Sequence, residues 1–240
     1  MRIARIISLI MFGFLMGAGL VIATGEPLAL FAGPPVVFGI EYLQANYNLG
    51  NVLGINLSNI TKNLTNGNNM GGIQETIYWG LWEDVQTWPA LSTSPANLTA
   101  VVEPTGTLAM KAGKYLYTLY NTVDAGELKF EQQGEIDGIS YKGVLSIFHP
   151  GMQKKILGFM SQMKNENLFF IVKDAEGQMF LFGDANFAAK LESGNTTTSQ
   201  KTSGRKGTTM NFFWYTNTPI ILDSSFNPAT LLNGTSGSGS

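Results

Sequence analysis

The strongest constraint on the fold is a change of period at Gly71, where apolar and polar side chains begin to alternate every second residue. This alternation predicts β-strands that bury one face and expose the other. The runs 168–174 and 178–184 flank a short turn at Gly177, which predicts a β-hairpin. We therefore expect a mainly β protein. Its strands are predicted at 75–82, 115–120, 127–136, 139–148, 168–174, 178–184 and 210–217.

One α-helix is predicted to interrupt the strands, at about 151–164. Pro150 suits the first turn of a helix, where its missing N–H costs no hydrogen bond. Apolar side chains then recur three and four residues apart and form a stripe that we expect to pack on the core. The pattern therefore predicts a mainly β domain with one packed helix. The stripe consists of Met152, Ile156, Phe159, Met160 and Met163.

Charged residues are unevenly distributed, which divides the chain into segments with different surroundings. We expect a hydrophobic N-terminal helix or arm at 1–43, an Asn-rich linker at 44–70 and a β domain at 71–225. A flexible tail is expected at 226–240, and the polar segment 192–210 is interpreted as a long loop, which is typical of function or disorder. Before position 62 the charged residues are Arg2, Arg5, Glu26 and Glu41.

The apolar run 6–23 follows two arginines and carries no charge itself. Interpreted as a secretory signal, the arginines form its positive start. Interpreted as a membrane anchor, the run is just long enough to cross the hydrocarbon core. A third interpretation is an arm buried in neighbouring protein subunits. The sequence leaves these alternatives open.

Composition narrows the possible functions. The chain has no cysteine, which excludes disulfides, thiol nucleophiles and cysteine-bound metals. A net charge of −2 gives no basic field of the kind that drives nucleic-acid binding. A Ser-His-Asp triad would have to use His149, and no Gly-x-Ser-x-Gly motif accompanies it. We therefore expect a protein without catalysis, cofactor or metal.

A group of carboxylates between residues 124 and 137 allows two further interpretations. Paired carboxylates could hydrolyse a glycosidic bond, and an acidic patch could bind calcium. The alternation places Glu127 and Glu131 on the solvent side of their strand, which favours a solvated or interface-lining face. The group consists of Asp124, Glu127, Glu131, Glu135 and Asp137.

Another alternative is a secreted or membrane-anchored β domain that forms a surface fibre or binds a glycan or protein partner. Aromatic side chains would form the binding surface, although aromatic residues on strands belong more often to the core. The candidates are Trp79, Trp82, Trp88, Trp214 and Tyr215.

Several segments resemble, in order, the tail tube proteins of tailed bacteriophages, over about 71–222. The segment GGIQETIYWGLWEDV (71–85) resembles the first strand of that family, with its glycine pair and acidic turn. The segment 110–151 is similar to the family's strand, acidic turn, long strand and Pro-Gly helix start. The segments 156–184 and 203–222 resemble its helix and hairpin, then its loop and last strand. The hydrophobic N-terminal segment is an addition to this pattern.

The resemblance implies a tail-tube-like β-barrel or β-sandwich with one packed helix. It also implies a structural virion protein of the phage particle that assembles with copies of itself. A hexameric ring would form through sheet edges, and rings would stack through long loops, for which 85–105 and 192–210 are candidates. Other virion proteins would be partners, the tube could pass DNA without reading its sequence, and 6–23 could contact lipid. The assembly and lumen candidates are Glu127, Glu131, Glu135, Asp137, Lys201, Arg205 and Lys206.

Overall fold

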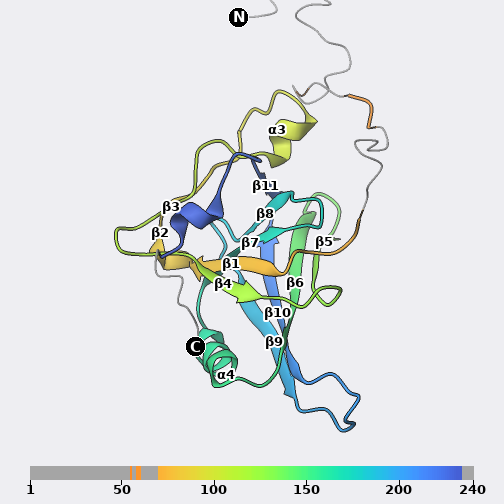
Figure 1. Cartoon of the computed structure of the whole chain (residues 1–240). Coiled ribbons are helices and arrows are strands. Elements are labelled where there is room, and N and C mark those ends of the chain that lie inside the picture. The colour runs from red at the N-terminus through yellow and green to blue at the C-terminus, as the bar shows by residue number, and fades with distance from the viewer. Residues whose placement is uncertain (1–54, 56–57, 61–69, 234–240) are drawn as a thin grey trace, which may run out of the picture. The chain divides into compact units, whose positions relative to one another are not determined.

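The structure is a computed structural model that describes residues 55, 58–60 and 70–233 (Figure 1). The predictions for 1–43 lie outside the described residues, as do those for most of 44–70 and for 234–240. In the part of the chain that is described, no helix is both long enough and apolar enough to cross a membrane.

Two antiparallel sheets form most of the described domain, and a third, small sheet lies beside them. The five-stranded sheet has the order β11-β8-β7-β1-β4 and the four-stranded sheet the order β5-β6-β10-β9. The five strands are β1 (Thr76–Leu81), β4 (Tyr117–Tyr120), β7 (Leu168–Lys173), β8 (Met179–Phe182) and β11 (Ile220–Leu222). The four-stranded sheet contains β5 (Glu127–Gln133), β6 (Ser140–Pro150), β9 (Lys190–Thr197) and β10 (Gly207–Thr216). The small sheet contains β2 (Val85–Thr87) and β3 (Ala109–Met110).

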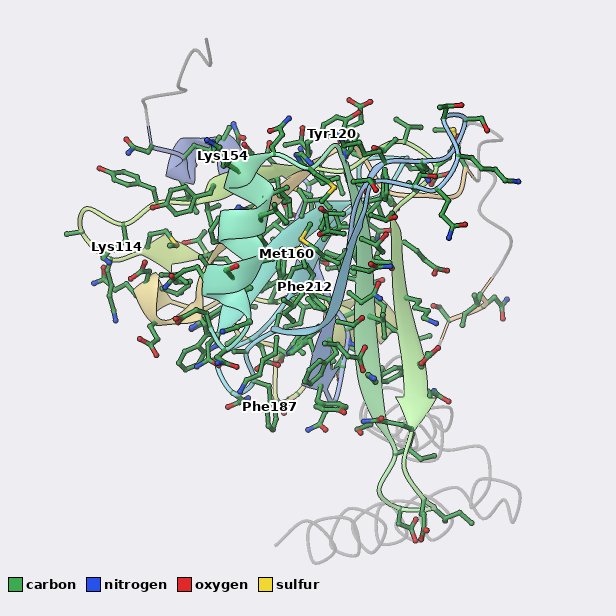
Figure 2. The ribbon with its side chains drawn as sticks, turned by 90° about the horizontal axis from the view of Figure 1, so that it is seen from below. Lys114, Tyr120, Lys154, Met160, Phe187 and Phe212 are labelled. Atoms are coloured by element: carbon green, nitrogen blue, oxygen red, sulfur yellow. The ribbon has the colours of Figure 1, made fainter. Side chains whose placement is uncertain are left out.

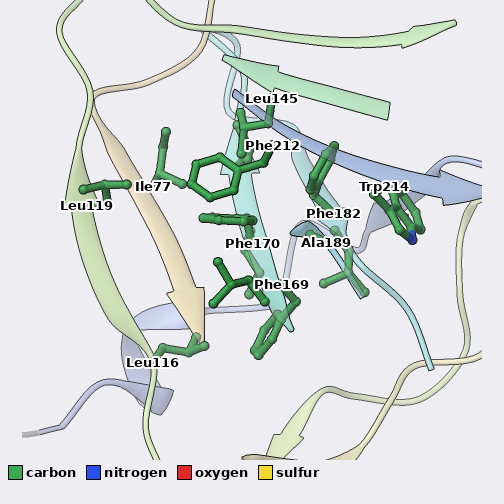
Figure 3. Packing of buried hydrophobic residues seen from close by; sticks show 14 of the residues in the cluster. Ile77, Leu116, Leu119, Leu145, Phe169, Phe170, Phe182, Ala189, Phe212 and Trp214 are labelled. Carbon is green, nitrogen blue, oxygen red and sulfur yellow. The ribbon is translucent and has the colours of Figure 1, made fainter. Parts of the chain in front are cut away.

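The mainly β prediction is confirmed, and its barrel alternative is wrong. Within the described residues none of the three sheets closes on itself. The two large sheets instead pack face to face, and aromatic rings from both fill the space between them (Figure 3). Phe170 of β7 lies 4.5 Å from Phe212 of β10, measured between ring centroids. Phe182 of β8 lies 5.6 Å from Trp214 of β10.

The strand β7 is buried on both of its faces, which explains its continuous apolar run. One face meets the four-stranded sheet through Phe170. On the other face, Phe169 packs edge-on against Trp88 at 5.2 Å between ring centroids and approaches Leu116 near Gly80. A strand covered on both sides has no need for polar residues at alternate positions.

The predicted helix is present as α4 (Lys154–Met163), but it begins later than expected. Pro150 is the last residue of β6, where it pairs with Gly207, so its predicted place in the first helical turn is wrong. Gly151 follows with φ 80, a conformation that glycine adopts without strain. This turn takes the chain out of the strand before the helix begins.

The apolar stripe of α4 packs on the core as predicted. Ile156 is 4% exposed, and Phe159 packs edge-on against Trp79 of β1 at 4.9 Å between ring centroids. Thr196 of β9 donates a hydroxyl hydrogen bond to the sulfur of Met160 at 3.6 Å. The helix therefore joins one strand from each sheet.

Gly158→Ala is expected to raise the free energy of unfolding by about 0.5–1 kcal/mol, because glycine in a helix interior loses more backbone entropy on folding than alanine does. A Cβ atom at this position of α4 would meet nothing within 4 Å. Urea denaturation of the two proteins measures the difference. A lower stability in the alanine variant would show that another group occupies this space.

A second helix, α3 (Leu98–Val102), was not predicted, so the expectation of one helix is wrong. Asn97 precedes it, and the side-chain oxygen of Asn97 accepts a hydrogen bond from the Ala100 N–H at 2.9 Å. Such caps stabilise short helices that carry no long apolar stripe. The stretch 85–105 thus contains β2 and α3 and is not a free loop.

The prediction of a long loop at 192–210 is also wrong, because β9 covers 190–197 and β10 begins at Gly207. The connecting loop is only 198–206. Apolar alternation did not reveal β9 because it is an edge strand whose side chains are mostly exposed. At its inward position, the Thr196 hydroxyl lies 3.1 Å from the hydroxyl of Thr208. A polar residue thus occupies an inward position of β9, where the alternating pattern requires an apolar one.

The flexible tail expected from residue 226 is folded over its first part. Pro228 is buried in the 3₁₀-helix η4 (Pro228–Leu231), and another 3₁₀-helix, η3 (Trp82–Asp84), follows β1. Leu232 forms a parallel bridge with Leu116, whose N–H donates to the Leu231 carbonyl at 2.9 Å. The folded domain therefore includes residues 226–233.

Candidate assembly surface

The predicted assembly residues fall into three groups on the four-stranded sheet. Glu127 and Glu131 lie on the outward face of β5, as the alternation predicted. Glu135 and Asp137 lie in 134–139, the turn between β5 and β6, which we call the tip. The third group lies in 198–206, the turn between β9 and β10, which we call the basic loop. It consists of Lys201, Arg205 and Lys206, all exposed.

The outward face of the sheet carries both signs of charge. The Lys129 ammonium lies 2.8 Å from a Glu131 carboxylate oxygen. This hydrogen bond raises the pKa of Lys129 above its ordinary value and lowers the pKa of Glu131 below its own. Lys142 is the register partner of Glu131, and its ammonium lies 2.6 Å from a carboxylate oxygen of Glu192 in β9. An acidic lumen built from Glu127 and Glu131 would therefore be partly neutralised by lysines on the same face.

Glu127 and Glu131 are spaced along one strand rather than placed side by side. They are four residues apart, so their Cα atoms are about 13 Å apart. The two carboxyl groups of a glycosidase lie about 5–10 Å apart. In the described part of the chain, no group of three or more His, Cys, Asp or Glu side chains could hold a metal ion.

The tip has a defined backbone conformation. The Gly138 N–H donates to the Glu135 carbonyl at 3.0 Å, which closes a tight turn, and Asp137 has φ 69. Gly134 has φ 111, and a Cβ there would collide with the Gly138 carbonyl. Glycine at 134 is therefore required for the two strands to meet in this turn.

Two isoleucines of the tip are exposed in the described chain. Ile136 is 90% exposed and Ile139 is 60% exposed. Turn residues are normally polar or glycine, so two large apolar side chains beside two carboxylates are unusual. Ile136 and Ile139 were not among the predicted assembly residues, although their position in GEIDGI, between glycines and acids, was a usable signal. Exposed apolar side chains grouped in this way are typical of a contact surface.

The basic loop is attached to the end of β6. The Arg205 guanidinium lies 4.1 Å from the centroid of the Phe148 ring, a cation–π contact. The Lys206 carbonyl accepts a hydrogen bond from the Gly151 N–H at 3.1 Å. Within the loop, the Gly204 N–H donates to the Lys201 carbonyl at 2.9 Å. The loop is thus held in place at its base, while its cationic groups remain exposed.

Two exposed apolar side chains lie at the same end as the basic loop. Tyr120 is 42% exposed and packs edge-on against His149, with 6.3 Å between ring centroids. Val123 is 52% exposed, and its neighbour Thr122 donates its N–H to the Phe148 carbonyl at 2.9 Å. Phe148 therefore contacts both the 121–126 turn and Arg205. We call Tyr120, Val123 and the basic loop together the basic end.

The tip and the basic end lie at opposite ends of one sheet. In the β6–β10 ladder, Tyr141 next to the tip pairs with Thr216, whereas Pro150 pairs with Gly207 next to the basic loop. Figure 2 shows the hairpin of β5 and β6 extending on the side away from Tyr120 and Lys154.

The sheet margins are the second feature of this surface. Among the described strands, β5 and β9 have no partner on their outer sides, and the same holds for β4 and β11 of the five-stranded sheet. Unpaired strand edges are templates for pairing with another chain.

The aromatic residues proposed for glycan binding do not form one exposed surface. Trp214 is 0% exposed and lies in the core, and the other three tryptophans are partly buried. The Trp82 indole N–H donates to the Asp184 carbonyl at 2.6 Å. Tyr215 is 41% exposed. Trp214 therefore serves packing, and Tyr215 is the most exposed of the five candidates.

Comparisons with protein families, with curated proteins and with solved structures found no match to this chain. In the described part of the chain, the fold is a three-sheet β domain whose two large sheets have outer strands without a partner, and whose four-stranded sheet carries two hairpin ends of opposite charge.

Proposed function

We propose that this chain is a non-catalytic structural protein that assembles with copies of itself, in the manner of the tail tube proteins of tailed bacteriophages. The observation that carries the proposal is the open four-stranded sheet, whose margins β5 and β9 are both without a partner among the described strands. Edges of this kind favour aggregation in a monomer, whereas an assembly uses them.

The strand directions of the sheet support pairing between copies. Neighbouring strands in the order β5-β6-β10-β9 are all antiparallel, so β5 and β9 run in opposite directions. When β9 of one copy lies beside β5 of the next, the new pair is antiparallel as well. The sheet can therefore continue through many copies without changing its hydrogen-bonding pattern.

Such a contact joins two different surfaces and is heterologous. A heterologous contact forms a ring when its rotation closes and a filament when it does not. A closed hexameric ring that stacks into a tube is the form that the resemblance to tail tube proteins implies, with the phage particle as its location and other virion proteins as further partners.

Cysteine cross-linking tests the edge contact directly, because the natural chain has no cysteine. Lys129 of β5 and Ser193 of β9 lie on the outward face, and a disulfide requires Cα atoms about 4–7 Å apart. In the full-length protein, we expect Lys129→Cys/Ser193→Cys, or the same pair shifted by two residues to Glu127 or Glu131, to form ladders of covalent multimers on oxidation.

The matched control combines Lys129→Cys with Glu176→Cys, an exposed position in the β7–β8 turn, and should give no ladder beyond the dimer. Negative-stain electron microscopy of the wild-type protein should show rings or tubes. A protein that stays a dispersed monomer would contradict the proposed function. Rings without cross-linking in any register would show that another surface joins the copies.

A further inference from the structure

The tip combines exposed apolar side chains with a fixed backbone conformation. Ile136 is 90% exposed and Ile139 is 60% exposed, and burial of this apolar surface against a partner is favourable. The hydrogen bond between Gly138 and Glu135 and the positive φ of Gly134 already hold the turn in one conformation. A preorganised turn loses little conformational entropy when it binds.

The charges around these isoleucines select the partner. The tip carries Glu135 and Asp137 and contains no basic residue, whereas the basic loop carries Lys201, Arg205 and Lys206 and contains no acidic one. Contact between two tips, or between two basic loops, would bring like charges together. The exposed Asp124 lies next to Val123, so three cations and one carboxylate leave the basic end net positive. Contact between a tip and a basic end therefore pairs mainly opposite charges.

The basic end also offers apolar surface for the isoleucines. Val123 and Tyr120 are 52% and 42% exposed there. The Thr122 N–H donates to the Phe148 carbonyl at 2.9 Å, and the Arg205 guanidinium lies 4.1 Å from the centroid of the Phe148 ring. The apolar and cationic groups are therefore close to the same residue. A surface with both kinds of group complements a tip that has both apolar and acidic side chains.

We infer that the tip of one copy binds the basic end of a second copy, head to tail along the strand direction. This inference rests on the proposed self-assembly and names the second contact that it needs. The tip and the basic end lie at opposite ends of the β6–β10 ladder, so the contact can repeat without limit. Edge pairing between β5 and β9 extends the assembly across the strands, and the tip contact extends it along them.

Charge reversal on one side at a time tests the inference in the full-length protein. The tip variant is Glu135→Lys/Asp137→Lys, and the basic-loop variant is Lys201→Glu/Arg205→Glu/Lys206→Glu. Each variant alone faces like charges at every contact, and we expect its stacking affinity to fall on the order of 100-fold. Sedimentation velocity and electron microscopy should then show single rings in place of stacked assemblies.

Mixing the two variants should restore stacking, because each basic tip then meets an acidic loop and each acidic tip meets a basic loop. A chain that carries all five substitutions should stack with itself but not with the wild type. Ile136→Ser/Ile139→Ser should weaken stacking in a way that mixing does not restore. The control Glu83→Lys/Glu176→Lys reverses two exposed charges outside both surfaces and should stack as the wild type does.

Restored stacking in the mixture would show that both variants are folded, because a misfolded variant would not regain binding on mixing. Wild-type rings whose β5 and β9 cysteines cross-link, together with a mixture that does not stack, would overturn this inference and leave the proposed function intact. Single variants that stack as the wild type does would overturn it as well. A wild-type protein that remains monomeric would overturn both.

Discussion

Replacing Phe170 with alanine is expected to lower the free energy of unfolding by about 3–5 kcal/mol. Phe170 is 0% exposed on β7, the middle strand of the five-stranded sheet. Its ring lies 4.5 Å from Phe212 of the opposite sheet and 6.1 Å from Phe182 of the neighbouring strand. Alanine would leave a cavity where the two sheets meet, and the rigid strands around it can close only part of that space (Figure 3).

Urea denaturation followed by tryptophan fluorescence measures the loss. Phe187→Ala is the matched control, because the same atoms are removed at a position that is 54% exposed. We expect the control to change stability by less than about 0.5 kcal/mol. Equal effects of the two substitutions would show that the two sheets do not share this core.

The second large effect is expected from Gly207→Val, which should lower the free energy of unfolding by about 3 kcal/mol. Gly207 is buried at the start of β10, between Pro150 of β6 and Thr197 of β9. A Cβ there would lie 2.5 Å from the carbonyl oxygen of His149 and would also overlap the Phe148 ring. Because one of these neighbours is backbone, the collision cannot be relieved by a change of rotamer.

Gly71→Val is the control for this substitution, since a Cβ at Gly71 meets nothing within 4 Å. Thermal unfolding followed by circular dichroism should separate the two variants clearly. A valine at 207 that leaves the melting temperature unchanged would mean that β6, β9 and β10 do not approach one another as the structure shows.

These core substitutions also separate folding from assembly. Phe170→Ala and Gly207→Val act on buried contacts and should lower stability even in a monomer. The charge reversals change exposed groups and should lower the unfolding free energy by no more than about 2 kcal/mol, mostly because lysine replaces Asp137 at a positive φ. A charge variant that loses both stability and stacking would therefore need its stability restored before its effect on stacking is interpreted.

Strands with one buried and one exposed face were predictable from the sequence. In β5 the alternation of Leu128 and Phe130 with charged residues identified both the strand and its exposed side. The β7–β8 hairpin was also predicted, because Gly177 marks its turn and has φ 92. The apolar stripe of α4 was identified correctly, whereas the start of the helix was not.

The missed elements have a common physical cause. The sequence patterns report hydrophobic burial, and β9 forms through backbone hydrogen bonds to β10 with little burial of its own. The helix α3 depends on a cap at Asn97 more than on an apolar face. Whether the sheets close into a barrel depends on which strands pair, and no pattern within a single strand encodes that.

The candidate surface divides in the same way. The local pattern grouped Glu135 and Asp137 with the neighbouring carboxylates but placed Glu135 inside a predicted strand, which in the structure ends at Gln133. The resemblance to tail tube proteins, together with the predicted loop, pointed to the cations of the basic loop. Alternation within each strand likewise determined which residues face water, because burying one face of a strand leaves the other solvated. The tertiary structure alone decided that the acidic tip and the basic loop occupy opposite ends of one open sheet. That arrangement follows from the long-range register between β6 and β10, which joins residues far apart in the chain through contacts that no local segment contains.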